Sequence, residues 1–221
     1  MSILSKIKTV DFARRLYYQV QHPKKQIVLH HTVSGVGVGG DLATWRQNAD
    51  RIATCLIIHH DGTPYQCFGS KNWAHHLGVK QKVFGAYGFT NNASRNVKLN
   101  QCSVAVEIDS AGGLKLDGGG WKSSFNTYIQ DDRVIEYPGG YRDFYAFERY
   151  TDAQIESLRK LLLYWRDNTY PDIPLAYRGD IWDVSGAALA GEPGVYTHVS
   201  FRPDKSDCHP QPELIQMLES L

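Results

Sequence analysis

The strand signal at residues 26–30 constrains the fold of this chain most strongly, because a short β-branched run ends there in two histidines, His30 and His31. A strand that ends in histidine holds an imidazole rigidly at the edge of a sheet, as a metal site requires. The C-terminal part offers His198 as a partner, followed by an acid and a thiol. Two histidines and one anionic ligand leave zinc an open position for a water molecule.

Further strand and helix signals predict an α/β fold in which helices flank a mixed central sheet. Apolar runs at 54–59 and 63–68 predict a hairpin, and the run at 103–108 predicts a central strand. A near capping box at Thr151 begins a helix that keeps its apolar spacing as far as residue 167. Three more helices are predicted, over residues 3–18, over residues 42–51 with Asp41 as the N-cap, and over residues 213–221.

The length of 221 residues suits one domain with a good-sized core. We expect residues 1–25 to form an N-terminal helical extension and residues 26–221 to form the main domain. Glycine runs at 118–120 and 139–140 and many aromatic residues between about 112 and 149 predict an inserted region of loops and hairpins.

The formal net charge of +1 argues against a broad electrostatic grip on nucleic acid or an anionic membrane, although it permits a local basic patch. The sequence contains no run of about 18 apolar residues, so we expect no segment that inserts into a membrane. Four scattered cysteines without a CxxC pair indicate reduced thiols, as in a protein made in the cytoplasm. Lys6, Lys8 and Asp11 interrupt any signal-peptide core, so we expect no signal peptide.

Six motifs follow one another in a meaningful order: residues 27–32, 56–63, 73–78, 103–108, 150–154, and His198 with 205–207. In this order they resemble the type 2 N-acetylmuramoyl-L-alanine amidases, zinc enzymes that share their fold with phage amidase-lysozymes and peptidoglycan recognition proteins. The resemblance covers roughly residues 26–217 and implies that 26–221 is a zinc amidase domain.

The resemblance implies that His30 and His198 are zinc ligands, with His31 as a neighbour that points the other way. The third ligand of this family is an Asp or a Cys, usually two residues after a lysine. Asp207 satisfies that rule with Lys205, and Cys208 is the alternative, because a thiolate is also a good zinc ligand.

The same resemblance implies two catalytic residues. Glu107, near the end of the 103–108 strand, corresponds to the catalytic carboxylate, which takes a proton from the attacking water and delivers it to the leaving amine. An unpaired glutamate in a strand of Val, Ala and Ile is costly to bury, which favours a functional role over packing. Lys205 corresponds to the cation that stabilises the oxyanion.

Four further residues are candidates for substrate binding. Trp73, His75 and His76 match the family segment that lines the substrate groove, although a core position suits the tryptophan nearly as well. Arg202 is placed to pair with a substrate carboxylate. His59 and His60 flank the predicted hairpin turn, and we expect them to be surface residues.

These expectations combine into zinc-dependent hydrolysis of the N-acetylmuramoyl-L-alanine bond in peptidoglycan, by a phage-type endolysin that reaches the cell wall after release with the help of a holin. One alternative is a cytoplasmic amidase that recycles muropeptides. A second is a non-catalytic peptidoglycan-binding module, and a third is a zinc amidohydrolase that cuts another amide.

Overall fold

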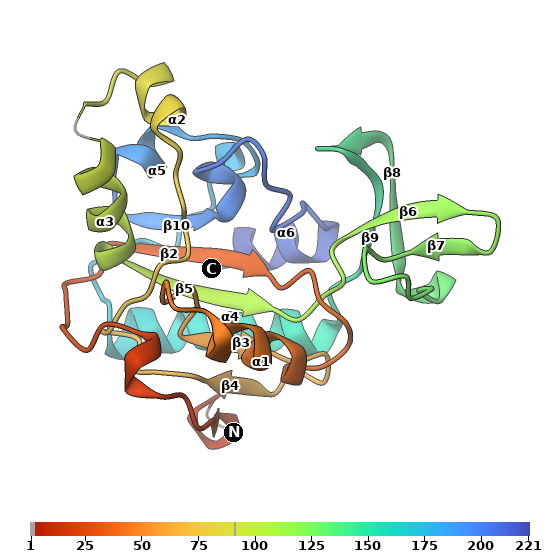
Figure 1. Ribbon diagram of the computed structural model, residues 1–221, viewed down its shortest axis with the longest axis horizontal. Helices are drawn as coiled ribbons and strands as arrows, with labels where there is room; N and C mark the ends of the chain where they lie inside the picture. Colours follow the sequence, from red (N-terminus) through yellow and green to blue (C-terminus); the bar gives the residue numbers. More distant parts are fainter. Residues whose placement is uncertain (1–2, 91) are drawn as a thin grey trace.

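A mixed six-stranded sheet forms the centre of the computed structural model, which describes residues 3–90 and 92–221 (Figure 1). Its strands are β1 (Lys8–Thr9), β2 (Gln26–His31), β3 (Leu56–Ile58), β4 (Pro64–Gln66), β5 (Ser103–Ile108) and β10 (Gly194–Thr197). They lie in the order β1-β4-β3-β5-β2-β10. Strands β10, β2, β5 and β3 run parallel, while β3 and β4 form the antiparallel hairpin that the sequence predicts.

The central strands are buried on both faces because helices cover both sides of the sheet. All six residues of β2 and all six of β5 are buried, as is typical of parallel strands inside an α/β fold. The helices are α1 (Gly39–Gln47), α2 (Gln81–Ala86), α3 (Asn92–Cys102), α4 (Asp152–Asn168), α5 (Gly186–Ala190) and α6 (Pro212–Glu219). In Figure 1, α1 lies in front of the sheet and α4 behind it. The predicted α/β class is confirmed.

Helix α4 begins as the sequence predicts. The Thr151 hydroxyl accepts a hydrogen bond from the Gln154 backbone N–H at 3.1 Å, and the Gln154 side chain accepts one from the Thr151 N–H at 2.9 Å. This capping box satisfies two N–H groups that the helix itself cannot pair. Its apolar side chains, Leu158, Leu161 and Trp165, are buried in the main core.

A second, four-stranded sheet stands beside the main one (Figure 1). It contains β6 (Gly113–Asp117), β7 (Gly120–Lys122), β8 (Val134–Tyr141) and β9 (Phe144–Glu148), in the order β7-β6-β9-β8. The sheet has a small core of its own, which includes Leu114 and Ile129. The predicted insertion boundaries, 112–149, bracket these strands.

The N-terminal region differs from the predicted helix over 3–18. Two short 3₁₀ turns, η1 (Ile3–Lys6) and η2 (Arg14–Leu16), flank strand β1, which pairs with β4. Phe12 and Leu16 are buried in the main core, so tertiary burial outweighs the weak helical spacing. Residues 1 and 2 of the predicted extension lie outside the described residues.

The prediction that Asp41 caps a helix at 42–51 is also wrong in its boundary. Helix α1 starts at Gly39, three residues before the predicted start, and ends at Gln47, so Asp41 lies in its first turn. Its buried carboxylate accepts a hydrogen bond from the Ser34 hydroxyl at 3.2 Å. Asp41 therefore anchors the loop after β2 rather than the helix N-terminus.

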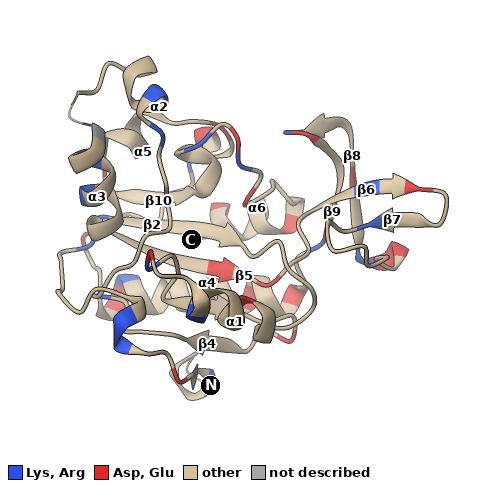
Figure 2. Cartoon of the chain, in the orientation of Figure 1, with Lys and Arg blue, Asp and Glu red and all other residues tan. Residues whose placement is uncertain are grey.

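Basic and acidic residues are both spread over the molecule. Figure 2 shows basic and acidic segments interspersed over both sheets, with basic segments on α3 and where the chain enters β2. Among residues 3–90 and 92–221, no helix is both long and apolar enough to cross a membrane.

Candidate metal centre and active site

The predicted site residues meet at the carboxyl ends of the parallel strands, where open α/β sheets usually bind their ligands. His30 of β2 pairs in register with Glu107 of β5, so both side chains lie on the same face of the sheet. His198 follows β10 directly, in the 3₁₀ turn η5 (His198–Ser200). Asp207 lies in the loop after that turn, and its carboxylate reaches both histidines.

Three side-chain atoms converge closely in this cluster. Nδ1 of His30 lies 3.1 Å from Nδ1 of His198 and 3.1 Å from Oδ2 of Asp207, and Nδ1 of His198 lies 2.9 Å from the same oxygen. All three residues are buried. The structure thus brings together the three residues that the sequence proposes as metal ligands.

A chain of hydrogen bonds behind His30 determines where its proton lies. The Ser103 hydroxyl donates to the Leu99 carbonyl at 2.7 Å, so its oxygen accepts from Nε2–H of His76, also at 2.7 Å. Nδ1 of His76 is then an acceptor, and it faces Nε2 of His30 at 3.1 Å. The proton of a neutral His30 therefore lies on Nε2, which leaves the lone pair of Nδ1 directed at the cluster.

His198 has the same tautomer for a simpler reason. Its Nε2 lies 2.9 Å from the Leu77 carbonyl oxygen, which can only accept a hydrogen bond. In the neutral imidazole Nε2 therefore carries the proton, and the lone pair is on Nδ1. Burial, reinforced by His198, lowers the pKa of His30 to about 4, which keeps its imidazole neutral near pH 7. Burial acts to raise the pKa of Asp207, but His198 and His30 outweigh it and hold that pKa well below its usual range.

The cluster therefore fits a metal ion. Two imidazole lone pairs and one carboxylate oxygen lie within 3.1 Å of one another, and three such acceptors repel unless a cation lies between them. Neutral histidines and an ionised carboxylate are the protonation states that metal binding needs. Two nitrogens and one oxygen, with the far histidine nitrogens hydrogen-bonded, match the ligand set of a catalytic zinc site.

Cys208 takes no part in this cluster. Among the described residues, the group of atoms around His30 and His198 is completed by Asp207 alone. Cys208 is fully buried, and burial raises the pKa of its thiol well above the usual range, which disfavours the thiolate that binds metals. The geometry therefore favours Asp207 as the third ligand.

Glu107 lies beside the cluster in a pocket of about 490 Å³, here called the metal-side pocket, which His30, His198, Asp207 and Glu107 line together. Its Oε2 is buried and has no hydrogen-bond partner in the described part of the chain. Burial, with nearby Asp207 and Asp41, raises the pKa of Glu107 well above its usual range. A buried carboxyl with a free oxygen and a raised pKa suits proton transfer.

Four of the other predicted residues, Lys205, His75, His76 and Arg202, also line the metal-side pocket. Arg202 is partly engaged, because Nε and Nη2 donate to the two oxygens of Asp204 at 3.1 and 2.8 Å. His76 is held in the pocket wall by hydrogen bonds to His30 and Ser103.

Trp73 does not line the metal-side pocket. It is 7% exposed and stacks on Tyr18, with ring centroids 3.8 Å apart and planes within 7°. Backbone hydrogen bonds between these two residues hold the rings together. Trp73 therefore packs against Tyr18 in the segment leading to His75, outside the lining of the metal-side pocket.

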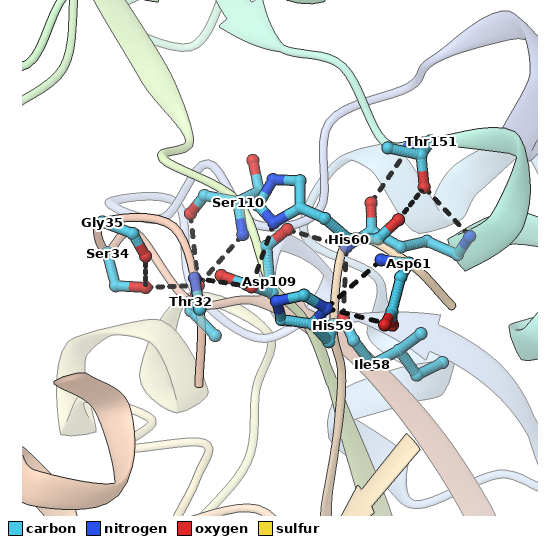
Figure 3. Close-up of polar contacts among 12 residues, drawn as sticks. Thr32, Ser34, Gly35, Ile58, His59, His60, Asp61, Asp109, Ser110 and Thr151 are labelled. Atoms are coloured by element: carbon cyan, nitrogen blue, oxygen red, sulfur yellow. Dashed lines mark hydrogen bonds and ion pairs between the residues drawn. The ribbon is translucent and has the colours of Figure 1, made fainter. Parts of the chain in front are cut away.

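A second polar cluster corrects the expectation that His60 is a plain surface residue (Figure 3). Nδ1 of His60 lies 3.0 Å from Oδ2 of the fully buried Asp109, and Nε2 lies 3.3 Å from Oε1 of buried Glu148. Burial lowers the pKa of His60, but the bonds to both carboxylates outweigh it and raise the pKa to about 9. Although His59, His60 and Asp109 lie close enough for a metal, both ring nitrogens of His60 already face carboxylates. We interpret His60 as a structural cation that bridges the two buried carboxylates.

Sequence reasoning missed the residues that position the site from behind. Ser103 starts β5 and orients His76, while the Asn100 side chain accepts hydrogen bonds from the backbone N–H groups of His76 and Leu77. Nothing in the sequence marks these two polar residues apart from their place next to the central strand.

The fold and the cluster together define a class: an α/β protein with a candidate metallohydrolase site at the carboxyl end of its sheet. A family model for N-acetylmuramoyl-L-alanine amidases matches residues 20–211. The chain belongs to this family. A comparison with curated proteins by sequence found no match.

Several solved structures resemble this one at low sequence identity. The amidase LysC from Clostridium intestinale is 13% identical, with a TM-score of 0.49 over 97% of this chain and 95% of that chain. The Ph2119 endolysin of a Thermus scotoductus bacteriophage is 12% identical, with a TM-score of 0.46 over 94% and 92%. Drosophila PGRP-LB is 14% identical, with a TM-score of 0.46 over 97% and 94%.

Proposed function

We propose that this protein hydrolyses the amide bond between N-acetylmuramic acid and L-alanine in peptidoglycan, with Zn²⁺ held by His30, His198 and Asp207. The observation that supports this most directly is the convergence of three lone-pair atoms within 3.1 Å, beside a buried glutamate with a free oxygen. The membership of the amidase family supports the choice of bond.

A zinc ion held by His30, His198 and Asp207 would supply Lewis-acid chemistry, polarising the scissile carbonyl and lowering the pKa of the attacking water. Glu107 takes a proton from this water on Oε2 and delivers it to the L-alanine nitrogen as the C–N bond breaks. Lys205, in the wall of the same pocket, stabilises the negative charge that develops on the carbonyl oxygen. His76 and Leu77 hold the two histidines in the required tautomers.

We further propose that the protein acts as a phage-type endolysin, which requires release to the wall with the help of a holin. The size of the substrate that the protein cleaves tests this role. An endolysin cleaves intact sacculi, whereas a recycling amidase prefers small soluble muropeptides. A non-catalytic module binds sacculi and releases nothing.

Mass spectrometry of digested sacculi tests the proposed bond. Wild-type protein should release peptides that begin with L-alanine and leave intact glycan strands, and His30→Ala should release none. Cleavage at another amide would contradict the choice of substrate. Equal release by His30→Ala would contradict the role of the cluster.

A further inference from the structure

A second pocket, of about 580 Å³, lies at the opposite end of the strands from the metal cluster. We call it the basic pocket, because its described lining includes Lys25, Arg95, Lys98 and His22 but no aspartate or glutamate. Lys25 precedes β2, and His30 lies five residues further along, so about 16 Å of extended strand separates the two. The basic pocket is thus distinct from the metal-side pocket.

Rigid elements hold these cations together. Arg95 and Lys98 are three residues apart on α3 and therefore lie on one face of that helix. Lys25 is fixed through its backbone, since its N–H donates to the Cys102 carbonyl at 2.7 Å and its carbonyl accepts from Gly194 N–H at 3.1 Å. The fold therefore places three positive side chains around one concavity.

No carboxylate neutralises these cations within the described residues. Six other arginines have an acidic partner, as Arg178 does in Asp180 at 3.1 Å, whereas Lys25, Arg95 and Lys98 form no such pair in the part of the chain that the structure describes. Glu192, which follows the pocket-lining Gly191, lies 3.8 Å from Arg178 instead. The partly buried Cys102 adds no negative charge, because burial raises the pKa of its thiol.

Arg95 is held ready for a ligand rather than free in solvent. Its guanidinium carbon lies 4.3 Å from the centroid of the Phe89 ring, and Nη1 donates to the Leu189 carbonyl at 3.4 Å. Its Nε is buried and has no hydrogen-bond partner in the described part of the chain. A guanidinium stacked on an aromatic ring in the wall of a pocket is well suited to bind an oxyanion.

We propose that the basic pocket binds a phosphorylated sugar, either free or as a repeating unit of a phosphate-bearing wall polymer. The three cations that line the pocket supply the charge for one phosphate group. The volume leaves room for the attached sugar, against which Pro23 and Leu99 offer apolar surface. The pocket is concave and local in a chain of net charge +1, which favours this ligand over a membrane surface or a nucleic-acid duplex.

Calorimetric titration of the full-length protein with N-acetylglucosamine 1-phosphate tests this inference. Inorganic phosphate and neutral N-acetylglucosamine serve as the two partial ligands, and a poly(glycerol phosphate) chain tests the polymer source. The variants are Lys25→Glu and Lys98→Glu, both exposed positions. Lys115→Glu is the matched control, because it makes the same charge change at an exposed position of the second sheet.

The phosphosugar should bind at least tenfold more tightly than either partial ligand. Both Lys25→Glu and Lys98→Glu should lower its affinity at least tenfold, with Lys115→Glu unchanged. Tighter binding of the polymer than of the monomer would identify the wall polymer as the source, and the reverse a free phosphosugar. Three results would overturn the proposal: an affinity for inorganic phosphate equal to that for the phosphosugar, no binding of the phosphosugar at all, or wild-type affinity for the phosphosugar in both pocket variants. The measurement needs no turnover, so it stands apart from the proposed amidase activity.

Discussion

Removing the His76 side chain should weaken zinc binding, although His76 is not itself a ligand. In the structure Nδ1 of His76 accepts a hydrogen bond from Nε2–H of His30. Nε2–H of His76 donates to the Ser103 hydroxyl, which in turn donates to the Leu99 carbonyl. His76→Ala removes that acceptor, so Nε2–H of His30 is left without its partner and the competing tautomer becomes accessible. In that tautomer Nδ1 carries the proton and cannot bind a metal.

The size of the effect follows from the geometry. One hydrogen bond of 3.1 Å to a buried ligand is lost, and partners of this kind change metal affinity by about 10–100-fold. This corresponds to about 1.4–2.8 kcal/mol of binding free energy. His76→Asn keeps an acceptor oxygen near the position of Nδ1 and should recover most of the affinity.

Competition with a fluorescent zinc chelator measures this affinity directly, and far-ultraviolet circular dichroism checks that the variants fold. If His76→Ala bound zinc as tightly as wild type, while remaining folded, the tautomer argument would be refuted. A role in substrate binding alone would give that result, with only KM altered.

Three other outcomes follow from the same contacts. Asp207→Ala should lose zinc and Cys208→Ala should retain it by metal analysis; loss in Cys208→Ala alone would reverse the ligand assignment. Trp73→Ala should lower the free energy of unfolding by about 3–5 kcal/mol in a denaturant titration, with little change in kcat for the folded fraction, and a selective loss of kcat would restore a substrate role. His60 has a folded pKa of about 9 against about 6.5 when unfolded, so its ion pairs contribute fully below pH 6.5 and are lost as the pH rises through 9. Wild type should therefore lose on the order of 1–3 kcal/mol of stability over this range relative to His60→Gln. Parallel pH profiles of the unfolding free energy in the two proteins would contradict this structural role.

The sequence predicted the elements whose signals are local. Buried parallel strands need apolar runs, and β2 and β5 are such runs. Helix α4 has both its capping box and its apolar spacing in the sequence. The N-terminal region has only a weak helical spacing, and the contacts of Phe12 and Leu16 with the main core outweigh it.

The candidate site divides in the same way. The motifs indicate His30, His198 and Glu107, but adjacent residues such as Asp207 and Cys208 can be separated only when their side chains are placed. The pairing of His60 with Asp109, 49 residues away, depends on β3 and β5 being neighbours in the sheet. No spacing in the sequence contains that information.

Zinc content and product release, measured together on Glu107→Gln, test the central claim most directly. The substitution keeps the shape of the side chain and removes its ability to accept a proton. We predict zinc bound at the wild-type level and release of L-alanine peptides from sacculi slowed by about 10²–10⁴-fold, the usual contribution of a general base. Wild-type release from a zinc-loaded Glu107→Gln protein would contradict the claim that this cluster and this glutamate form one hydrolytic site.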